Sequence, residues 1–193
     1  MLRDGDPVAP TAEFNARNAA MAICVARFAG LSDEQIRSAL LTFRGVKRRQ
    51  TERGTVRGIK IIDDFGHHPT AIRETLRGLR QRYAGSRLWA LFEPRSNTSR
   101  RNALQGELID ALKEADGAIV AAVSHPEKVP AGQILDVDAV TVAVRAAGRQ
   151  AYHEADVDAI IARLKPLAKE GDVVIVFSNG GFDGIHAKLL ERL

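Results

Sequence analysis

The chain has 193 residues, of which 45% are hydrophobic and 27% are charged. This balance is typical of a folded globular protein and excludes a disordered chain. The net charge of +4 is mild and only 5% of residues are aromatic, which argues against a stacking surface for single-stranded nucleic acid. The sequence has no apolar run near the roughly 20 residues of a membrane helix. We therefore expect neither a nucleic-acid partner nor a membrane partner.

The cysteine content and the first residues indicate the compartment. The single cysteine, Cys24, excludes a disulfide framework and a cysteine-rich zinc site. Because Cys24 lies in an alanine-rich apolar stretch, we expect a buried structural thiol. Residues 1–6 carry charge with no apolar segment behind it, so they do not predict a signal peptide. These features predict a cytoplasmic protein.

Two helices are predicted in residues 1–45. Residues 15–30 are mostly small and apolar, which predicts a helix that is buried in tight packing and ends at Gly30. Ser32 is a good N-cap for a second helix that ends at Gly45. The apolar stripe of this second helix comprises Ile36, Leu40 and Phe43. Since no sheet precedes these helices, we expect them to be the end of a domain whose body lies outside this sequence.

From Thr51 onward, short apolar strands alternate with amphipathic helices. Strands at 55–56 and 59–62 are joined by a tight turn at Arg57 and Gly58. Near-continuous apolar runs at 88–92, 118–123 and 173–177 predict strands buried on both faces. The helical stripes between and after them begin at Ile72, Leu104, Val157 and Ile185. The pattern predicts an α/β domain with a Rossmann-like, doubly wound, mostly parallel sheet.

Polar segments follow three of these strands. In open α/β sheets, ligands bind beyond the carboxyl ends of the strands, so each segment is a candidate site. Residues 63–70 read Asp-Asp-Phe-Gly-His-His-Pro-Thr, and residues 93–101 read Glu-Pro-Arg-Ser-Asn-Thr-Ser-Arg-Arg. Residues 178–184 read Ser-Asn-Gly-Gly-Phe-Asp-Gly.

Each segment has a functional interpretation and a structural one. The carboxylates and imidazoles of 63–70 can bind a metal or the ribose end of a nucleotide; alternatively, the segment is a strand-to-helix turn capped by Thr70. Arg95 can bind a carboxylate bidentately, unless residues 93–101 form only a solvated loop. Paired glycines let the backbone approach a ligand, but a Gly-Gly turn alone is weak evidence.

Two common catalytic motifs are missing from the sequence. It has no G-x-x-x-x-G-K-[ST] phosphate-binding loop. It has no Gly-x-Ser-x-Gly elbow either, and Ser178 has no evident Asp and His partners, so a hydrolase triad is not expected.

Together the segments resemble the C-terminal part of the Mur ligase family, the ATP-dependent amide-forming enzymes of peptidoglycan synthesis. The marks of the family are Asn15 and Asn18, the Arg48-Arg49 pair, and residues 63–70. Phe14 departs from the pattern, because the family often has His before Asn15. Residues 93–98 and 178–182 are similar to those of members that join the tripeptide L-Ala-γ-D-Glu-meso-diaminopimelate to UDP-N-acetylmuramate in murein recycling.

The resemblance implies a domain organisation and a reaction. Residues 1–49 would be the remnant of an ATP-binding central domain, and residues 50–193 the Mur ligase C-terminal domain that binds the amine substrate. ATP, with Mg²⁺, would phosphorylate the sugar carboxylate to an acyl phosphate, which the amine attacks. The partners would be UDP-N-acetylmuramate, the murein tripeptide, and the missing N-terminal and central domains of the same protein. The fragment alone would be inactive.

The resemblance also implies residue roles. Asn15, Asn18, Arg48, Arg49 and Asp64 would bind the nucleotide. Arg49, Asp64 and His67 would be catalytic. The implied substrate-binding residues are His68, Arg95, Ser96, Asn97, Thr98, Ser178, Asn179, Gly180, Gly181 and Phe182. No metal ligands are expected in this chain.

Three other interpretations stay open. The first is another step of the same family, such as L-alanine addition. The second is a metal-dependent phosphohydrolase that uses Asp63, Asp64, His67 and His68, although no further ligand pair has suitable spacing. The third is a non-catalytic module that binds a nucleotide or a peptide with the same loops.

Overall fold

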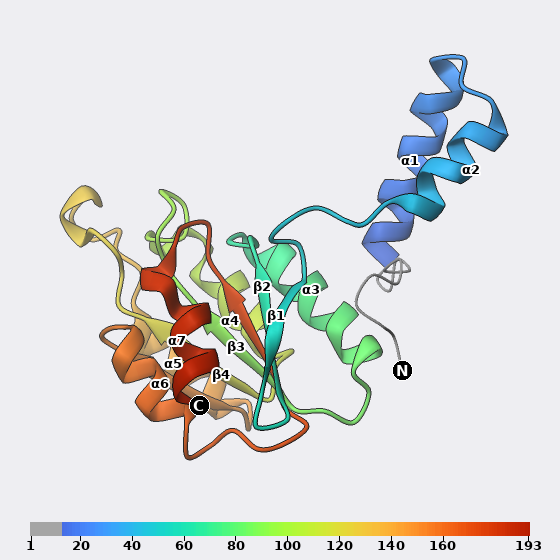
Figure 1. Ribbon diagram of the computed structural model, residues 1–193. Helices are drawn as coiled ribbons and strands as arrows, with labels where there is room; N and C mark the ends of the chain where they lie inside the picture. Colours follow the sequence, from blue (N-terminus) through green and yellow to red (C-terminus); the bar gives the residue numbers. More distant parts are fainter. Residues whose placement is uncertain (1–12) are drawn as a thin grey trace. The chain divides into compact units, whose positions relative to one another are not determined.

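The computed structural model describes residues 13–193, with side chains from Asn15 onward. The chain divides into two compact units between Lys47 and Arg48, and each is described by itself (Figure 1). Among the described residues, no helix is long and apolar enough to cross a membrane.

The first unit is a pair of helices, α1 (Glu13–Phe28) and α2 (Asp33–Thr42). Gly30 ends the α1 region in the left-handed conformation, with a φ of +84° and its N–H donating to the Arg27 carbonyl at 3.0 Å. Ser32 caps α2 as predicted. Its hydroxyl accepts from the Gln35 N–H at 3.3 Å, and the Gln35 side chain accepts from the Ser32 N–H at 2.9 Å.

The expectation of a tightly buried first helix is wrong for the described residues. Met21 is 65% exposed, Phe28 is 97% exposed, and Cys24 is exposed as well. Within this unit α1 packs against α2, and one neighbouring helix covers only one side of its apolar surface. The α2 stripe is likewise incomplete, since Ile36 is buried whereas Leu40 and Phe43 are exposed.

The second unit is built on a six-stranded sheet with the order β1-β2-β6-β3-β4-β5. The strands are β1 (Thr51–Val56), β2 (Ile59–Asp64), β3 (Leu88–Phe92), β4 (Gly117–Ala121), β5 (Gln150–Glu154) and β6 (Val173–Phe177). The β1 strand is antiparallel to β2, and all other pairs are parallel. Arg57 and Gly58 join β1 to β2 with φ values of 50° and 72°, as a tight hairpin turn requires. The predicted mostly parallel α/β fold is confirmed.

Helices cover both faces of this sheet (Figure 1). One face packs against α3 (Pro69–Arg82), α4 (Gln105–Leu112) and α5 (Val137–Ala146). The other packs against α6 (Val157–Leu164) and α7 (Ile185–Arg192). Successive strand residues alternate between the faces, so Trp89 and Leu91 meet α6 and α7 while Leu88, Ala90 and Phe92 meet the other helices. This double burial explains the unbroken apolar runs in the sequence.

Two elements were not predicted, α5 and β5. The β5 strand lies at the edge of the sheet and carries Gln150, His153 and Glu154, so it has no apolar run. The α5 helix was not predicted because its valines and its threonine are β-branched, and such residues favour strands over helices. Short 3-10 turns also precede α4 (Asn102–Leu104), follow β4 (Pro126–Lys128) and precede α7 (Phe182–Gly184).

The packing of Gly117 against Trp89 gives a stability prediction. A Cβ on Gly117 would overlap the Trp89 ring, whose Nε1 is fixed by a 3.2 Å hydrogen bond to Asp172. We expect Gly117→Ala to lower the free energy of unfolding by about 1–3 kcal/mol through overpacking. Urea unfolding followed by circular dichroism measures the change.

Gly106→Ala is the matched control, because Gly106 lies in α4 and a Cβ there meets nothing within 4 Å. This substitution should stabilise the protein by up to about 1 kcal/mol. Equal stability of the Gly117→Ala protein and the unsubstituted protein would contradict the packing of the core described above.

Candidate functional site

The candidate site lies where β2, β6 and β3 end. These strands are adjacent and parallel, so the segments that follow them meet at one edge of the sheet. The segment that enters the second unit, residues 48–50, joins the same edge, since the Phe65 N–H donates to the Arg48 carbonyl at 2.8 Å.

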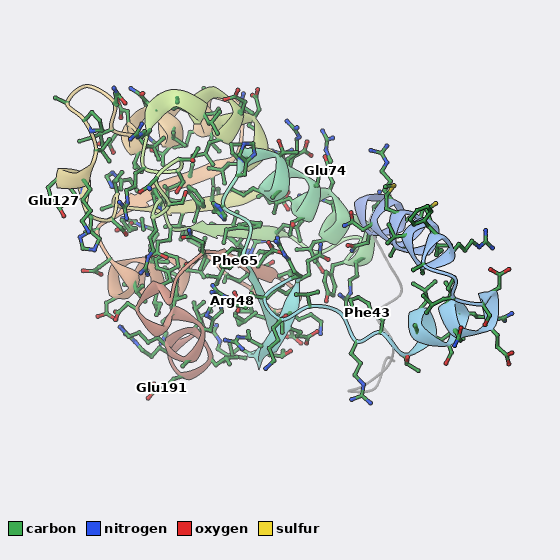
Figure 2. The ribbon with its side chains drawn as sticks, turned by 90° about the horizontal axis from the view of Figure 1, so that it is seen from above. Phe43, Arg48, Phe65, Glu74, Glu127 and Glu191 are labelled. Carbon is green, nitrogen blue, oxygen red and sulfur yellow. The ribbon has the colours of Figure 1, made fainter. Side chains whose placement is uncertain are left out.

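Arg48 is bound on several sides. Its N–H donates to the Thr51 hydroxyl at 3.0 Å, and its backbone is in the left-handed region with a φ of 59°. Its Nη2 donates to the carbonyls of Ser178 at 2.7 Å and Gly180 at 2.8 Å. The guanidinium also lies over the Phe65 ring, 5.2 Å from the centroid (Figure 2). The Arg48 side chain is thus engaged inside the fold.

Arg49 differs from its neighbour because it is exposed. Its guanidinium lies over the Phe65 ring at 5.8 Å from the centroid. The same ring meets His67 edge-on at 5.6 Å. An exposed guanidinium held by an aromatic face is well suited to pair with an anion such as a phosphate.

Asp63 is a fully buried carboxylate that faces two arginines and a histidine. Its oxygens lie 3.4 Å from Arg48 Nε, 3.6 Å from Arg53 Nε and 3.3 Å from His186 Nε2. Burial alone would raise the pKa of Asp63, but His186 and the two arginines outweigh it and hold the pKa below its usual value. The cluster joins the end of β2 to β1, to α7 and to residue 48.

Asp64 is also buried, with 2% of its surface exposed. One oxygen accepts from the Gly66 N–H at 2.7 Å and the other from the Gln50 N–H at 3.0 Å. Burial raises the pKa of this carboxyl despite those two hydrogen bonds. Both oxygens therefore orient backbone within the fold.

The two histidines that follow have different surroundings. His68, rather than Thr70, is the N-cap of α3, and its Nδ1 accepts from the Thr70 N–H at 3.3 Å. Pro69 then occupies the first turn, where its missing N–H costs nothing. His67 Nδ1 lies 3.1 Å from the Phe65 carbonyl, and its ring borders a pocket.

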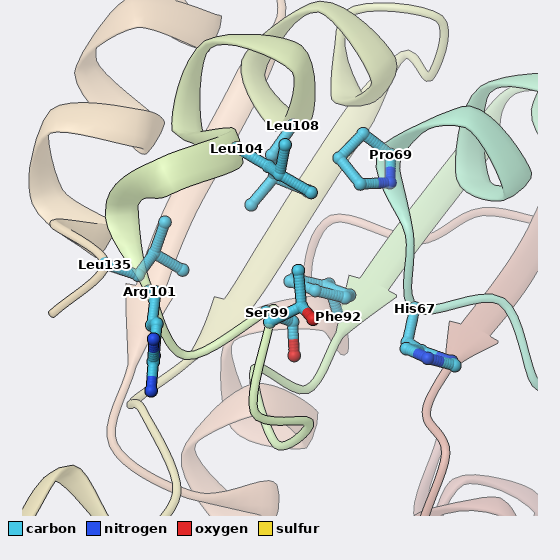
Figure 3. A pocket seen from close by; sticks show the side chains of 9 residues that line it. His67, Pro69, Phe92, Ser99, Arg101, Leu104, Leu108 and Leu135 are labelled. Atoms are coloured by element: carbon cyan, nitrogen blue, oxygen red, sulfur yellow. The ribbon is translucent and has the colours of Figure 1, made fainter. Parts of the chain in front are cut away.

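This pocket has a polar rim and an apolar floor (Figure 3). The rim is formed by His67, Thr98, Ser99 and Arg101, and the remaining lining residues are Pro69, Phe92, Leu104, Leu108 and Leu135. Leu135 comes from the segment after β4, which the sequence did not mark as part of the site. That segment is tied to the loop after β3 through the Leu135 N–H, which donates to the Arg100 carbonyl at 2.8 Å.

The loops after β3 and β6 share a buried hydrogen bond. The Ser178 hydroxyl donates to the Glu93 carboxylate and accepts from the Gly180 N–H at 2.9 Å. Both side chains are buried, so the Ser178 hydroxyl fixes the loop and is not open to a ligand. Arg95 is exposed and lies directly against Gly180, where a Cβ would overlap its guanidinium.

The other predicted site residues fall into three groups. Asn97, Thr98 and Gly181 are exposed at this edge, and Ser96 and Asn179 are half-buried. Phe182 is buried in the core beside α7. Asn15 and Asn18 lie on α1 in the other unit.

The arrangement does not match a metal-dependent phosphohydrolase. Across residues 13–193, no three His, Cys, Asp or Glu side chains come together as metal ligands. Asp63 is already paired with cations, and both oxygens of Asp64 accept backbone N–H groups.

Sequence reasoning missed Gln50, Arg53 and His186. His186 is one polar residue of the last helix, and its approach to Asp63 depends on how α7 packs on the sheet. Arg53 lies in a strand whose bulge sets where its side chain points. Neither residue carries a local sequence signal for these contacts.

Comparison with known proteins decides the family. The domain described as "Mur ligase, glutamate ligase domain" matches residues 48–180. The chain belongs to the Mur ligase family. A relative in Escherichia coli, UDP-N-acetylmuramate–L-alanyl-γ-D-glutamyl-meso-2,6-diaminoheptandioate ligase, is 36% identical over all of this chain and 41% of its own length. UDP-N-acetylmuramate–L-alanine ligase of Bradyrhizobium diazoefficiens is 39% identical over 86% of this chain and 35% of its own length.

Solved structures agree with this assignment. The crystal structure of a murein peptide ligase from Psychrobacter arcticus is 37% identical, with a TM-score of 0.72 over 93% of this chain and 37% of that one. A domain of a ligase from Haemophilus ducreyi is 32% identical, with a TM-score of 0.58 over 74% of this chain and 98% of that one. The chain thus spans about two fifths of the length of the curated relatives it matches.

The buried Asp63 cluster gives a second prediction. Asp63→Asn should lower the free energy of unfolding by about 3 kcal/mol at pH 7, because it leaves the facing cations without their buried partner. Since folding lowers the pKa of Asp63, the stability that its carboxylate contributes is lost as the pH falls through that lowered pKa. The difference between the two proteins should therefore shrink in acid, and urea titrations from pH 7 down to pH 3 measure it.

Asp110→Asn is the control, because Asp110 is an exposed carboxylate of α4 that pairs with Lys113, the C-cap of that helix. It should change stability by less than about 0.5 kcal/mol at any of these pH values. An Asp63→Asn protein as stable as this control would show that the buried cluster contributes nothing.

Proposed function

We propose that this chain is the C-terminal part of an ATP-dependent ligase that joins L-Ala-γ-D-Glu-meso-diaminopimelate to UDP-N-acetylmuramate through an acyl phosphate. In this proposal residues 1–49 end an ATP-binding central domain and residues 50–193 bind the incoming peptide. Support comes from the Escherichia coli relative of that name, which this chain matches over its whole length.

The observation that carries the proposal is the pair of exposed arginines at one edge of the sheet. Arg49 and Arg95 each present a guanidinium to solvent, and each lies on a segment fixed by buried polar groups. A ligase of this kind must hold a phosphate and a peptide rich in carboxylates close together. Two separate cationic groups on rigid loops suit those two anions.

On the nucleotide side, the surroundings of Arg49 suit ATP, since its exposed guanidinium can pair with a phosphate. Asp64 and Arg48 support this site without facing the phosphate. Asp64 accepts the Gln50 N–H, and Arg48 donates to the loop after β6. Asp63 faces two arginines, and each oxygen of Asp64 accepts a backbone N–H, so Mg²⁺ and the phosphate-binding loop are assigned to the other domains of the longer protein. Asn15 and Asn18 are assigned to the adenine.

On the peptide side, Arg95 binds a carboxylate, with Ser96, Asn97 and Thr98 beside it as further polar contacts. The loop after β6 contributes the backbone of residues 179–181, because the Ser178 hydroxyl and the Phe182 ring are buried. His67 lines the pocket and is proposed as a catalytic residue, and His68, the N-cap of α3, is proposed to lie nearer the amine substrate. Closure of the domains would exclude water from the acyl phosphate.

A second candidate is the addition of L-alanine, the step of the same family that uses a single amino acid. The Bradyrhizobium relative at 39% identity, an L-alanine ligase by name, favours it. The two candidates differ in the amine, so one assay separates them.

The proposed reaction predicts tripeptide-dependent ADP release. The longest reading frame that contains this chain is assayed with ATP, Mg²⁺ and UDP-N-acetylmuramate, and with tripeptide, free L-alanine or free diaminopimelate as the amine. We expect release with the tripeptide, and a loss of about 10³-fold in kcat on Arg49→Ala, because a guanidinium on the transferring phosphate is lost. Release with L-alanine alone would support the second candidate, and phosphate release without any amine would refute both.

Arg95 should govern binding of the peptide. Arg95→Ala is expected to raise KM for the tripeptide about 10- to 100-fold, because charge-assisted hydrogen bonds to a carboxylate are lost. KM for ATP should stay close to that of the unsubstituted enzyme. Arg163→Ala is the control, since Arg163 lies on α6 and pairs with Glu154. An unchanged KM for the tripeptide would remove Arg95 from the binding site.

A further inference from the structure

Arg48 connects three segments of the functional edge that are far apart in the sequence. Its carbonyl receives the Phe65 N–H at 2.8 Å, which ties it to the segment after β2. Its Nη2 donates to the carbonyls of Ser178 and Gly180 at 2.7 and 2.8 Å, which ties it to the loop after β6. These two hydrogen bonds come from one charged group, and such bonds are stronger than those of a neutral donor.

Gly180 in turn determines where Arg95 can lie. The Arg95 guanidinium occupies the space in which a side chain on Gly180 would stand. The Gly180 N–H donates to the Ser178 hydroxyl, which is bound to Glu93, two residues before Arg95. Any shift of residues 178–180 therefore moves the surface against which the Arg95 side chain rests.

Asp63 orients the Arg48 guanidinium for this contact. Its carboxylate lies 3.4 Å from Arg48 Nε, while Nη2 of the same guanidinium serves the two carbonyls. Arg53 and His186 flank the same carboxylate, at 3.6 and 3.3 Å. Arg53 is thus a second arginine beside the same carboxylate. Among the contacts of the described residues, no hydrogen bond joins Arg53 to the loop after β6.

We propose that Arg48 is a positioning residue that holds the loop after β6 and, through Gly180, sets the place of Arg95 for the carboxylate of the amine substrate. The substrate part of this inference rests on the function proposed above. Arg48 itself touches neither substrate. The neighbouring Arg49 keeps its backbone place independently, because Gln50 is bound to Asp64 and the Arg48 N–H to Thr51.

The loop-holding step is tested on the 193-residue chain by hydrogen–deuterium exchange. Arg48→Gln should speed exchange in residues 178–184 by about tenfold or more, because both carbonyls lose their donor. Arg53→Gln is the matched control: it removes the same charge next to Asp63 but no hydrogen bond to the loop, so exchange there should stay unchanged. Arg48→Lys keeps a charged donor, so its exchange rate in residues 178–184 should lie between those of the unsubstituted protein and Arg48→Gln. Equal exchange in the Gln variants of Arg48 and Arg53 would overturn the proposal.

The substrate step is tested by kinetics of the longest reading frame that contains the chain. Arg48→Gln should raise KM for the tripeptide about tenfold while KM for ATP changes by less than about threefold, and Arg53→Gln should change neither. A fall in kcat with both KM values unchanged would overturn the positioning role. If the unsubstituted enzyme releases no ADP with any amine, the proposed function fails, and the exchange result still decides whether Arg48 holds the loop.

Discussion

The candidate site depends on one buried anion, the Asp63 carboxylate. A charge without solvent contact needs oppositely charged partners, and here Arg48 and Arg53 provide them, with His186 against the same carboxylate from a third segment. Their contacts with Asp63 place residue 48, the β1 strand and α7 next to the end of β2. Once Arg48 is fixed there, its remaining donors reach the loop after β6.

The order of the strands explains why this local requirement affects the whole edge. Because β6 lies between β2 and β3, the loop that Arg48 holds is also the neighbour of the loop that carries Arg95. Glu93 and Ser178 close the other side of this contact with a buried hydrogen bond. Buried hydrogen bonds thus fix the backbone segments that carry the exposed arginines. This arrangement restricts the conformations of both arginines before a ligand binds.

Among the predicted site residues, side-chain position separates those open to a ligand from those that build the site. Arg49 and Arg95 remain open to solvent, whereas Arg48, Asp64 and Ser178 are engaged within the fold. All five lie in the motifs that resemble the family. A motif shows that a residue is needed at a position, but it does not show whether that residue binds a ligand or holds the backbone. A residue that holds a loop and a residue that binds a ligand are equally necessary to the site.

The sequence by itself determined the fold class, the central strands and the three segments at the functional edge. Apolar runs such as Val173–Phe177 and caps such as Ser32 are local signals that neighbours in the chain suffice to produce. The strand Gln150–Glu154 was not predicted, because it lies at the edge of the sheet, where a strand is only partly buried and needs no apolar run. Only the tertiary structure decided that His186 faces Asp63, that His68 caps α3, and that Arg48 and not Arg49 turns inward. The positions of His186 and Arg48 depend on the buried Asp63 carboxylate, which packing brings together with segments more than a hundred residues apart. The His68 cap is a local contact, but which of two nearby polar side chains makes it depends on the backbone at the end of β2.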